Sequence, residues 1–200
     1  MPKIVDHDHR RREIAMLTLD VMRAVGIENA SIRSIAQRGG VSMGVLTHYF
    51  KTKDDLVVFT FRWLADHSYA HLDRLIEDCA PGLPSLETAI EAMFPQASEP
   101  AALALWMSLW DRAVRNPIFA REHRNYYRRW RKYITKFLGD AIRLKQVPQS
   151  INVDIATDLI VAASDGLWLA MTLEPRRFSK AQRRVLLKKM IQNLTQRTNT

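Results

Sequence analysis

One short stretch of the chain, GGVSMGVLTHYFKTKDDL at residues 39–56, gathers side chains that could read another molecule. On a helical wheel of about 100° per residue, one arc of residues 43–50 has small or polar tips. This arc consists of Met43, Gly44, Thr47 and His48. The opposite arc is apolar and consists of Val45, Leu46, Tyr49 and Phe50. Hydroxyl and imidazole groups can hydrogen-bond to base edges, whereas methionine offers only apolar contact, for example to a thymine methyl group.

The residues around this short helix are those that a helix-turn-helix needs. Ala36 is small where two helices would cross, Gly40 can adopt a left-handed turn, and Leu46 is an apolar anchor in the second helix. A two-turn helix with a bare face fits a DNA major groove, which is about 12 Å wide. The alternative is an ordinary helical hairpin inside a core, but such a hairpin would not leave one arc unburied.

Apolar periodicity predicts helices along the rest of the chain and no sheet, because no window alternates at period two. The predicted helices cover 10–26, 32–38, 43–50, 53–78, 84–94, 99–115, 117–146, 152–173 and 179–195. Gly26 is a plausible helix end, and the DHDH stretch at 6–9 is interpreted as a mobile polar lead-in. The fold class is therefore predicted as all-α, with about nine helices: three small ones in an N-terminal head and six in a larger body.

Composition limits the class of protein. A hydrophobic fraction of 47% supports a real core, and no segment approaches the roughly 18 uninterrupted apolar residues of a membrane span. The single cysteine, Cys79, fits a reducing compartment, so a cytoplasmic location without membrane attachment is expected. The net charge of +9 indicates an anionic partner. Charge alone would misplace the site, because the excess is greatest not around the short helix but over 112–145, where only Glu122 and Asp140 are acidic.

The stretch SIRSIAQRGGVSMGVLTHYFKTKDDL, between an amphipathic helix and a long one, resembles the DNA-binding head of TetR-family regulators. The T-H-Y-F version of its core is similar to the BetI-type branch. The second half has BetI-like counterparts too, at Leu105-Trp106, Leu109-Trp110, Asn116-Pro117 and residues 165–169. The resemblance implies a helix-turn-helix DNA-binding domain at 1–53 and a ligand-binding and dimerisation domain at 54–200.

The resemblance also implies a division of labour in the head. Arg33 and Lys53 would hold phosphates, and Ser31 and Ser42 would offer hydroxyls or helix amides to the DNA backbone. Tyr49 would pack with its hydroxyl toward a phosphate. Base edges would be faced by Met43, Gly44, Thr47 and His48.

In the body, aromatic rings and acids could form a cage for a cationic ligand through cation–π attraction. The candidates are Trp106, Trp110, Asp111, Tyr126, Trp130, Asp165 and Trp168. BetI-type proteins respond to choline, which would suit such a cage; the alternative is that these rings are ordinary core. The helix at 152–173 has small residues that would let it pair with its twin in a homodimer, or that pack only within the protomer. These residues are Ala156, Ala162, Ala163, Gly166 and Ala170.

The segment REHRNYYRRWRKYITKF resembles a nucleic-acid arm when taken alone. However, Tyr126, Trp130, Ile134 and Phe137 form an apolar stripe through it, which favours a partly buried helix with a solvated basic face. Its charge would then add to the general field that draws the protein to DNA.

The predicted function is a homodimeric repressor that binds a palindromic double-stranded DNA operator and is released by a small-molecule effector, such as choline or another cationic or aromatic compound. An activator or a co-repressor-dependent regulator of the same fold is an alternative. An enzyme is not expected, because no phosphate-binding loop, H-E-x-x-H or Ser/His/Asp motif occurs, and no cofactor is predicted.

Two further alternatives are a metal-binding protein and a helical interaction protein. His67 and His71 could share a metal with Cys79 or His123, but two ligands without an evident third are weak evidence. A polar helix face is the favoured explanation, so no metal site is assigned. A helical interaction protein that binds no DNA is the last alternative. It would retain its activity after substitution of Thr47 and His48.

Overall fold

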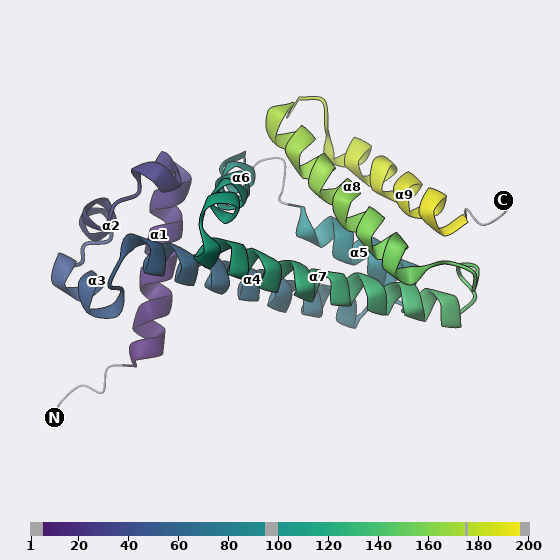
Figure 1. Cartoon of the computed structure of the whole chain (residues 1–200), viewed down its shortest axis with the longest axis horizontal. Helices are drawn as coiled ribbons and strands as arrows, with labels where there is room; N and C mark the ends of the chain where they lie inside the picture. The colour runs from purple at the N-terminus through teal and green to yellow at the C-terminus, as the bar shows by residue number, and fades with distance from the viewer. Residues whose placement is uncertain (1–5, 95–99, 175, 197–200) are drawn as a thin grey trace. The chain divides into compact units, whose positions relative to one another are not determined.

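The computed structural model describes residues 6–94, 100–174 and 176–196, which form nine α-helices and no strand (Figure 1). The helices are α1 (His7–Asn29), α2 (Ile32–Arg38), α3 (Met43–Tyr49), α4 (Lys53–Glu77), α5 (Leu83–Met93), α6 (Pro100–Arg115), α7 (Pro117–Arg143), α8 (Val153–Leu173) and α9 (Lys180–Gln196). The all-α prediction is confirmed, and each helix lies within about three residues of its predicted bounds. The predicted break around Pro95 falls partly outside the described residues.

Two capped short helices build the helix-turn-helix. Ser31 starts α2 with a capping box. The Ser31 hydroxyl oxygen accepts a hydrogen bond from the Ser34 backbone N–H, and the Ser34 hydroxyl oxygen accepts one from the Ser31 backbone N–H. Gly40 adopts φ +60°, the left-handed turn expected of it. Ser42 then caps α3 by accepting a hydrogen bond from the Val45 N–H. Leu46 is fully buried and anchors α3, as predicted.

The interpretation of residues 6–9 as a mobile lead-in is wrong. Asp6 is the N-cap of α1, and its side chain accepts hydrogen bonds from the backbone N–H groups of Asp8 and His9. An acid at this position satisfies otherwise free amides and favours the helix dipole, so the helix starts three residues earlier than apolar periodicity indicates. At the other end, Gly26 has a non-helical backbone, φ 80° and ψ 159°, and it kinks α1 where a helix end was predicted.

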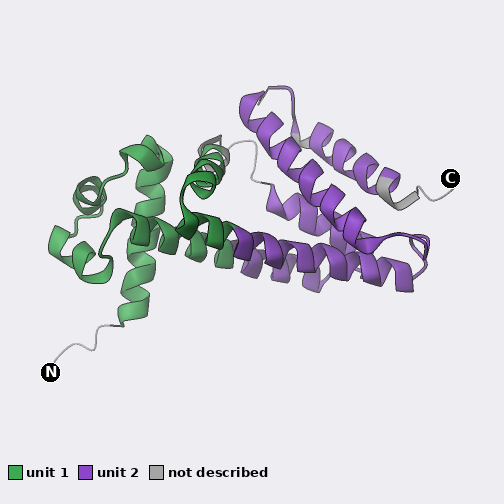
Figure 2. Cartoon of the chain, in the orientation of Figure 1, with its two compact units in different colours: residues 1–67, 104–123 green, residues 68–103, 124–200 purple. Residues whose placement is uncertain are grey.

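The chain divides into two compact units (Figure 2). Unit 1 comprises Met1–His67 and Ala104–His123, and unit 2 comprises Ser68–Leu103 and Arg124–Thr200, so α4, α6 and α7 contribute to both. Unit 1 includes more than residues 1–53, because Leu105, Leu109 and Phe119 join the core of α1–α4. The functional division at residue 53 remains a prediction.

Unit 2 has its own core, centred on buried residues of α4, α5, α7, α8 and α9, with α9 packed against both α5 and α8. Helix α8 leaves an apolar face uncovered. Its exposed large side chains are Ile155, Leu159, Leu169 and Leu173. By length and composition α8 could cross a membrane, and 33% of its apolar window is buried within the protomer.

Candidate DNA interface and effector site

The predicted reading arc of α3 is exposed. Met43, Gly44, Thr47 and His48 are all solvent-accessible, while Leu46 and Phe50 are buried against α1 and α4. Thr47 Oγ1 donates back to the carbonyl oxygens of Met43 and Gly44 at 3.0 and 3.3 Å. Its hydroxyl proton is therefore used inside the helix, and Thr47 presents a methyl group and an acceptor lone pair outward.

A ring cluster lies at the end of α3. The hydroxyl of Tyr49 and Nδ1 of His7, from the first turn of α1, are 3.0 Å apart, within hydrogen-bonding distance. His48 meets Tyr49 edge-on, with ring centroids 5.0 Å apart, and the His7 ring is 6.3 Å from His48. The contact with His7 was not predicted, because no local pattern links residues 42 positions apart.

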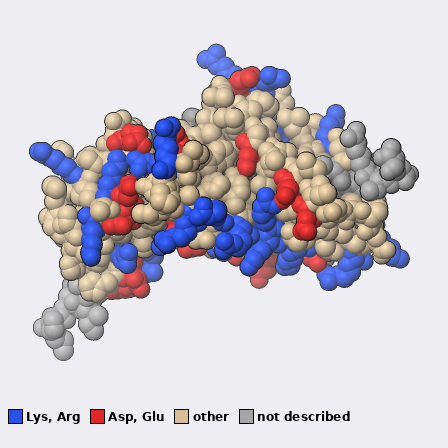
Figure 3. All heavy atoms as spheres, viewed as in Figure 1, with Lys and Arg blue, Asp and Glu red and all other residues tan. Residues whose placement is uncertain are grey.

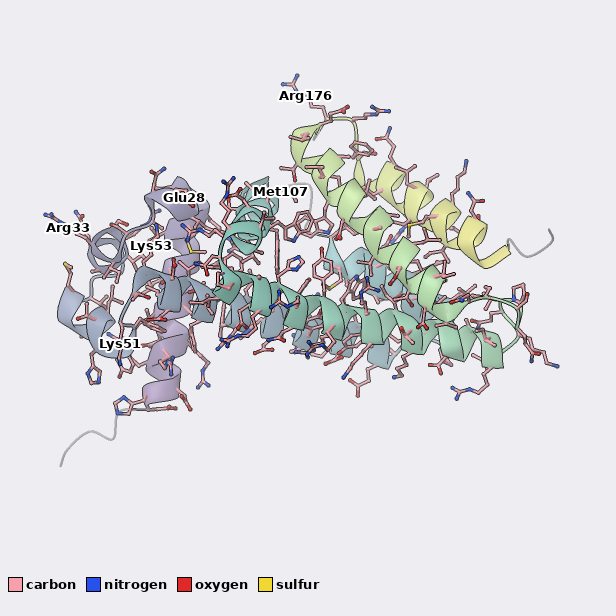
Figure 4. The ribbon with its side chains drawn as sticks, in the orientation of Figure 1. Glu28, Arg33, Lys51, Lys53, Met107 and Arg176 are labelled. Carbon is pink, nitrogen blue, oxygen red and sulfur yellow. The ribbon has the colours of Figure 1, made fainter. Side chains whose placement is uncertain are left out.

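The two residues predicted to hold phosphates, Arg33 and Lys53, differ in exposure and in hydrogen bonding. Arg33 points away from the helices into solvent, whereas Lys53 and Glu28 lie close together (Figure 4). The Lys53 ammonium donates to the Glu28 carbonyl oxygen at 2.9 Å. Burial, helped by the charge of Arg112, lowers the pKa of Lys53. Lys51 is exposed two residues earlier, whereas Lys53 is partly buried.

An ion network fixes the start of α4 inside unit 1. Arg112 of α6 donates to Glu28 at 2.8 Å and to Asp54 at 3.1 Å, and Asn116 also donates to Asp54 at 3.2 Å. The Arg112 side chain is mostly buried, but Glu28 is 75% exposed, so solvent screens the Arg112–Glu28 pair nearly as much as a surface pair. The two carboxylates come from the end of α1 and the start of α4, the helices that flank the helix-turn-helix.

In unit 2, one acid lies among aromatic rings. Tyr127 donates to the Asp165 carboxylate at 2.7 Å. Burial raises the pKa of Asp165, although the Tyr127 hydrogen bond and the charge of Arg131 oppose the rise. Tyr126 meets Tyr127 edge-on at 5.9 Å between ring centroids. A partly desolvated carboxylate beside aromatic faces is the combination that attracts an organic cation.

Other rings of unit 2 extend this cluster. Trp168 stacks on Phe94 at 5.8 Å between ring centroids. The ring of Tyr69, from α4, meets that of Tyr126 at a tilt of 48°, and the Tyr69 hydroxyl donates to the Tyr126 carbonyl oxygen at 2.9 Å. Phe94 and Tyr69 were not predicted, because aromatic residues on separate helices carry no local signal of meeting. Trp130 is only 5% exposed and lies in the core of unit 2, as the alternative interpretation expected.

The remaining predicted ligand residues belong to unit 1. Trp106 packs against Phe61, with ring centroids 5.9 Å apart, and Trp110 is half-buried on the same helix. Asp111 is exposed and pairs with Arg115 at 2.8 Å. Asp165 is therefore the stronger candidate for a counter-charge to a buried cation.

A separate cavity of about 480 Å³ opens in unit 2, and none of the predicted ligand residues lines it. Its charged lining consists of Asp73, Arg74, Glu77, Lys136 and Asp140. Asp73 accepts a hydrogen bond from Tyr133, and Asp140 pairs with Arg143. In the described part of the chain, no three His, Cys, Asp or Glu residues are grouped to hold a metal ion.

The small residues of α8 differ in exposure. Ala162, Ala163 and Gly166 are exposed and Ala170 is half-exposed, on the same side as the uncovered leucines. Ala156 is 5% exposed and packs in the core of unit 2, and at about 100° per residue it lies at the edge of this side, about 20° from Ala163. Ala156 is therefore the least accessible of the five small residues.

Two sequence families match the chain. Residues 84–196 match the BetI-type transcriptional repressor C-terminal domain, and residues 17–58 match the bacterial regulatory proteins of the TetR family. The regulator PksA of Bacillus subtilis is 30% identical over 90% of this chain and 87% of its own length. The BetI regulator of Cronobacter sakazakii is 30% identical over 96% of this chain and 93% of its own.

Solved structures have the same fold. A transcriptional regulator of Pseudomonas aeruginosa PAO1 aligns with a TM-score of 0.80 at 24% identity, covering 96% of this chain and 93% of that one. A regulator of Saccharomonospora viridis in complex with choline aligns with a TM-score of 0.82 at 20% identity, covering 92% and 96%. These structures share the fold, and the matched families and curated relatives show that this chain belongs to the TetR family as a BetI-type, DNA-binding transcriptional regulator and is not an enzyme.

Proposed function

We propose that the protein is a cytoplasmic homodimeric repressor that binds a near-palindromic operator when ligand-free and is released by a small organic cation. The observation that carries the DNA-binding part is the exposed arc of Met43, Gly44, Thr47 and His48 on a buried anchor. With one hydroxyl turned inward, this arc has few strong base-reading groups. Each half-site is then read weakly, and specificity depends on two heads bound about one DNA turn, ~34 Å, apart.

The dimer is supported by the uncovered face of α8. At about 100° per residue, Ile155, Leu159, Gly166, Leu169 and Leu173 fall within about 80° of one another. Large apolar side chains that are 46–71% exposed mark an interaction surface. Val185 and Leu186 of α9 are exposed as well, so a second copy related by a two-fold axis would complete a four-helix contact.

The effector class follows from Asp165. A carboxylate whose charge is disfavoured by burial is stabilised when a cation binds beside it, and the neighbouring tyrosines and Trp168 add cation–π attraction. The family resemblance and the choline bound to the Saccharomonospora viridis regulator support choline or a related quaternary ammonium. The 480 Å³ cavity fits this ligand less well, because its one aromatic residue, Phe137, is almost fully buried.

Helix α4 would couple the two sites. Tyr69 ties α4 to the tyrosines of the effector cluster, and Asp54, at the start of the same helix, is held by Arg112. Ligand would release DNA only if it favours a position of α4 that the DNA-bound heads cannot adopt. The Arg112 network is where such a shift would be transmitted to α1 and the reading helix.

The testing experiment measures binding of the purified protein to the DNA upstream of its own gene, with and without choline. Binding that choline weakens in wild type but not in Asp165→Asn supports the whole proposal. Glu77→Gln, in the charged cavity, is the matched control and should respond like wild type. Absence of specific binding to any fragment of this region would refute the self-regulating repressor, and binding indifferent to choline would refute this effector.

A further inference from the structure

The basic face of α7 has no role in the proposed function. It consists of Arg124, Arg128 and Lys132, which follow one another at four-residue intervals and are all exposed. At 1.5 Å rise per residue, they lie about 6 Å apart along the helix axis and cover about 12 Å. Buried Trp130, Ile134 and Phe137 occupy the opposite arc, so packing of the helix fixes the direction of this face.

The charges of this face are not neutralised by the described residues. The two acids of α7 are engaged elsewhere: Glu122 with Arg62 and Arg121, and Asp140 with Arg143. Arg131 forms an ion pair with Asp158 of α8. Arg124, Arg128 and Lys132 form no hydrogen bond or ion pair within the described ranges, which leaves three adjacent free cations.

The face extends further along the same helix, although with less net charge. Arg121 continues it at one end beside Glu122, and Lys136 continues it at the other beside the carboxylates of the charged cavity. In the view of Figure 3, Lys and Arg side chains gather over the first half of α7 with few acids between them. The three central residues therefore carry the strongest field.

The chemistry of the face selects a polyanion over a protein. Protein interfaces depend on buried aromatic and apolar anchors, and α7 exposes no large apolar side chain between residues 119 and 143. Guanidinium groups match phosphate oxygens in geometry as well as charge. A 12 Å row of cations would span about three to four phosphates of one DNA strand.

We propose that this basic face of α7 is a second DNA-binding surface, which holds the phosphate backbone of double-stranded DNA without reading its sequence. It rests on the proposed function only in that DNA is the polyanion this regulator meets. Its contribution is to non-operator affinity and to the salt dependence of binding, whereas the α3 arc supplies the preference for the operator.

The test compares two double variants of the full-length protein. Arg124→Gln/Arg128→Gln removes two arginine charges from the face. The control, Arg176→Gln/Arg177→Gln, removes two arginine charges from the exposed turn after α8 (Figure 4). Affinity is measured over a salt series for a duplex in which the operator sequence is scrambled. Each phosphate contact contributes about 0.9 to the slope of log affinity against log salt, so the first variant should lose about 2 from the slope and the control almost nothing.

The outcomes separate this inference from the proposed function. An equal loss in both variants would mean that only net charge matters, and no loss in either would leave the face to an acidic protein or to solvent; each result overturns the inference. The ratio of operator to scrambled affinity reports the α3 arc and should stay at its wild-type value in both variants. If wild type shows no operator preference, the proposed function fails while the salt slopes still decide the role of α7.

Discussion

Helices α3 and α8 each leave one face uncovered, but with opposite chemistry. The α3 face has small and polar tips on a seven-residue helix, and the α8 face has leucine, isoleucine and alanine on a 21-residue helix. A short polar insert suits a groove filled with hydrogen-bonding edges, whereas a long apolar face suits a second copy of itself. Uncovered faces thus indicate that a partner exists, and their side chains indicate which kind.

The largest expected effect comes from breaking the α8 face. Leu159→Glu places a charge in the proposed dimer contact, so the solution mass should fall to that of one protomer. Operator affinity should fall by about 100-fold or more, because the two heads no longer bind as a linked pair. Leu144→Glu is the matched control, since Leu144 is 46% exposed against 48% for Leu159 but lies beyond α7, away from this face. A dimer that persists in Leu159→Glu would place the contact elsewhere.

The α3 face can be tested with a substitution whose two effects have opposite signs. Gly44→Ala fits the helix, since the added carbon would meet only Ser42 Oγ, at 3.8 Å. The free energy of unfolding should rise by about 0.5–1 kcal/mol, because glycine is costly in a helix. Operator affinity should nevertheless fall by about tenfold, because the methyl group occupies the surface that approaches the bases.

Gly139→Ala in α7 provides the control for this pair of measurements. A carbon added at Gly139 meets nothing within 4 Å, so the same rise in stability is expected with unchanged operator affinity. If Gly44→Ala binds the operator as tightly as wild type, the close approach of α3 to the bases is disproved.

The comparison also shows what sequence can and cannot predict. The α3 face could be placed from periodicity, because a helix with one uncovered side repeats its polar residues locally. For α8 only the small residues were predicted, and the exposed isoleucine and leucines of its uncovered face were not. The Asp6 cap was misread because it precedes the apolar pattern. The burial of Ala156 could not be predicted, because the helical wheel places it about 20° from the exposed Ala163. The contacts between Tyr127 and Asp165 or Tyr49 and His7 could not be predicted, since they depend on how separate helices meet.

Asp165 differs from the residues of the α3 and α8 faces, because its carboxylate is partly buried. Burying the negative charge costs free energy, which a bound cation would offset. A carboxyl whose pKa is raised in the folded state binds its proton more tightly there than in the unfolded chain. The free energy of unfolding should therefore fall as pH rises from the unfolded pKa to the folded one, and Asp165→Asn should remove this fall. The variant should be more stable than wild type at neutral pH, as followed by denaturant unfolding across pH.

The same variant should bind choline more weakly, by about 2 kcal/mol or about 30-fold, because the counter-charge is gone. Quenching of tryptophan fluorescence measures the choline affinity. A variant that is more stable but binds choline more weakly would place the effector site at Asp165. A variant with wild-type choline affinity would move the counter-charge to another acid.

The smallest expected effect concerns the edge of the α3 face, where His7 of α1 holds the Tyr49 hydroxyl. If this contact orients Tyr49 toward a phosphate, His7→Ala should lower operator affinity by about fivefold, equivalent to about 1 kcal/mol for one hydrogen bond. The loss should disappear in a Tyr49→Phe background, because the hydroxyl that His7 positions is already absent. His9→Ala is the control, since His9 lies in the same helical turn but its Nδ1 faces the Glu13 carboxylate, 3.7 Å away. Additive losses in the double variant would show that His7 acts independently of Tyr49, and the reading surface would then end at α3 itself.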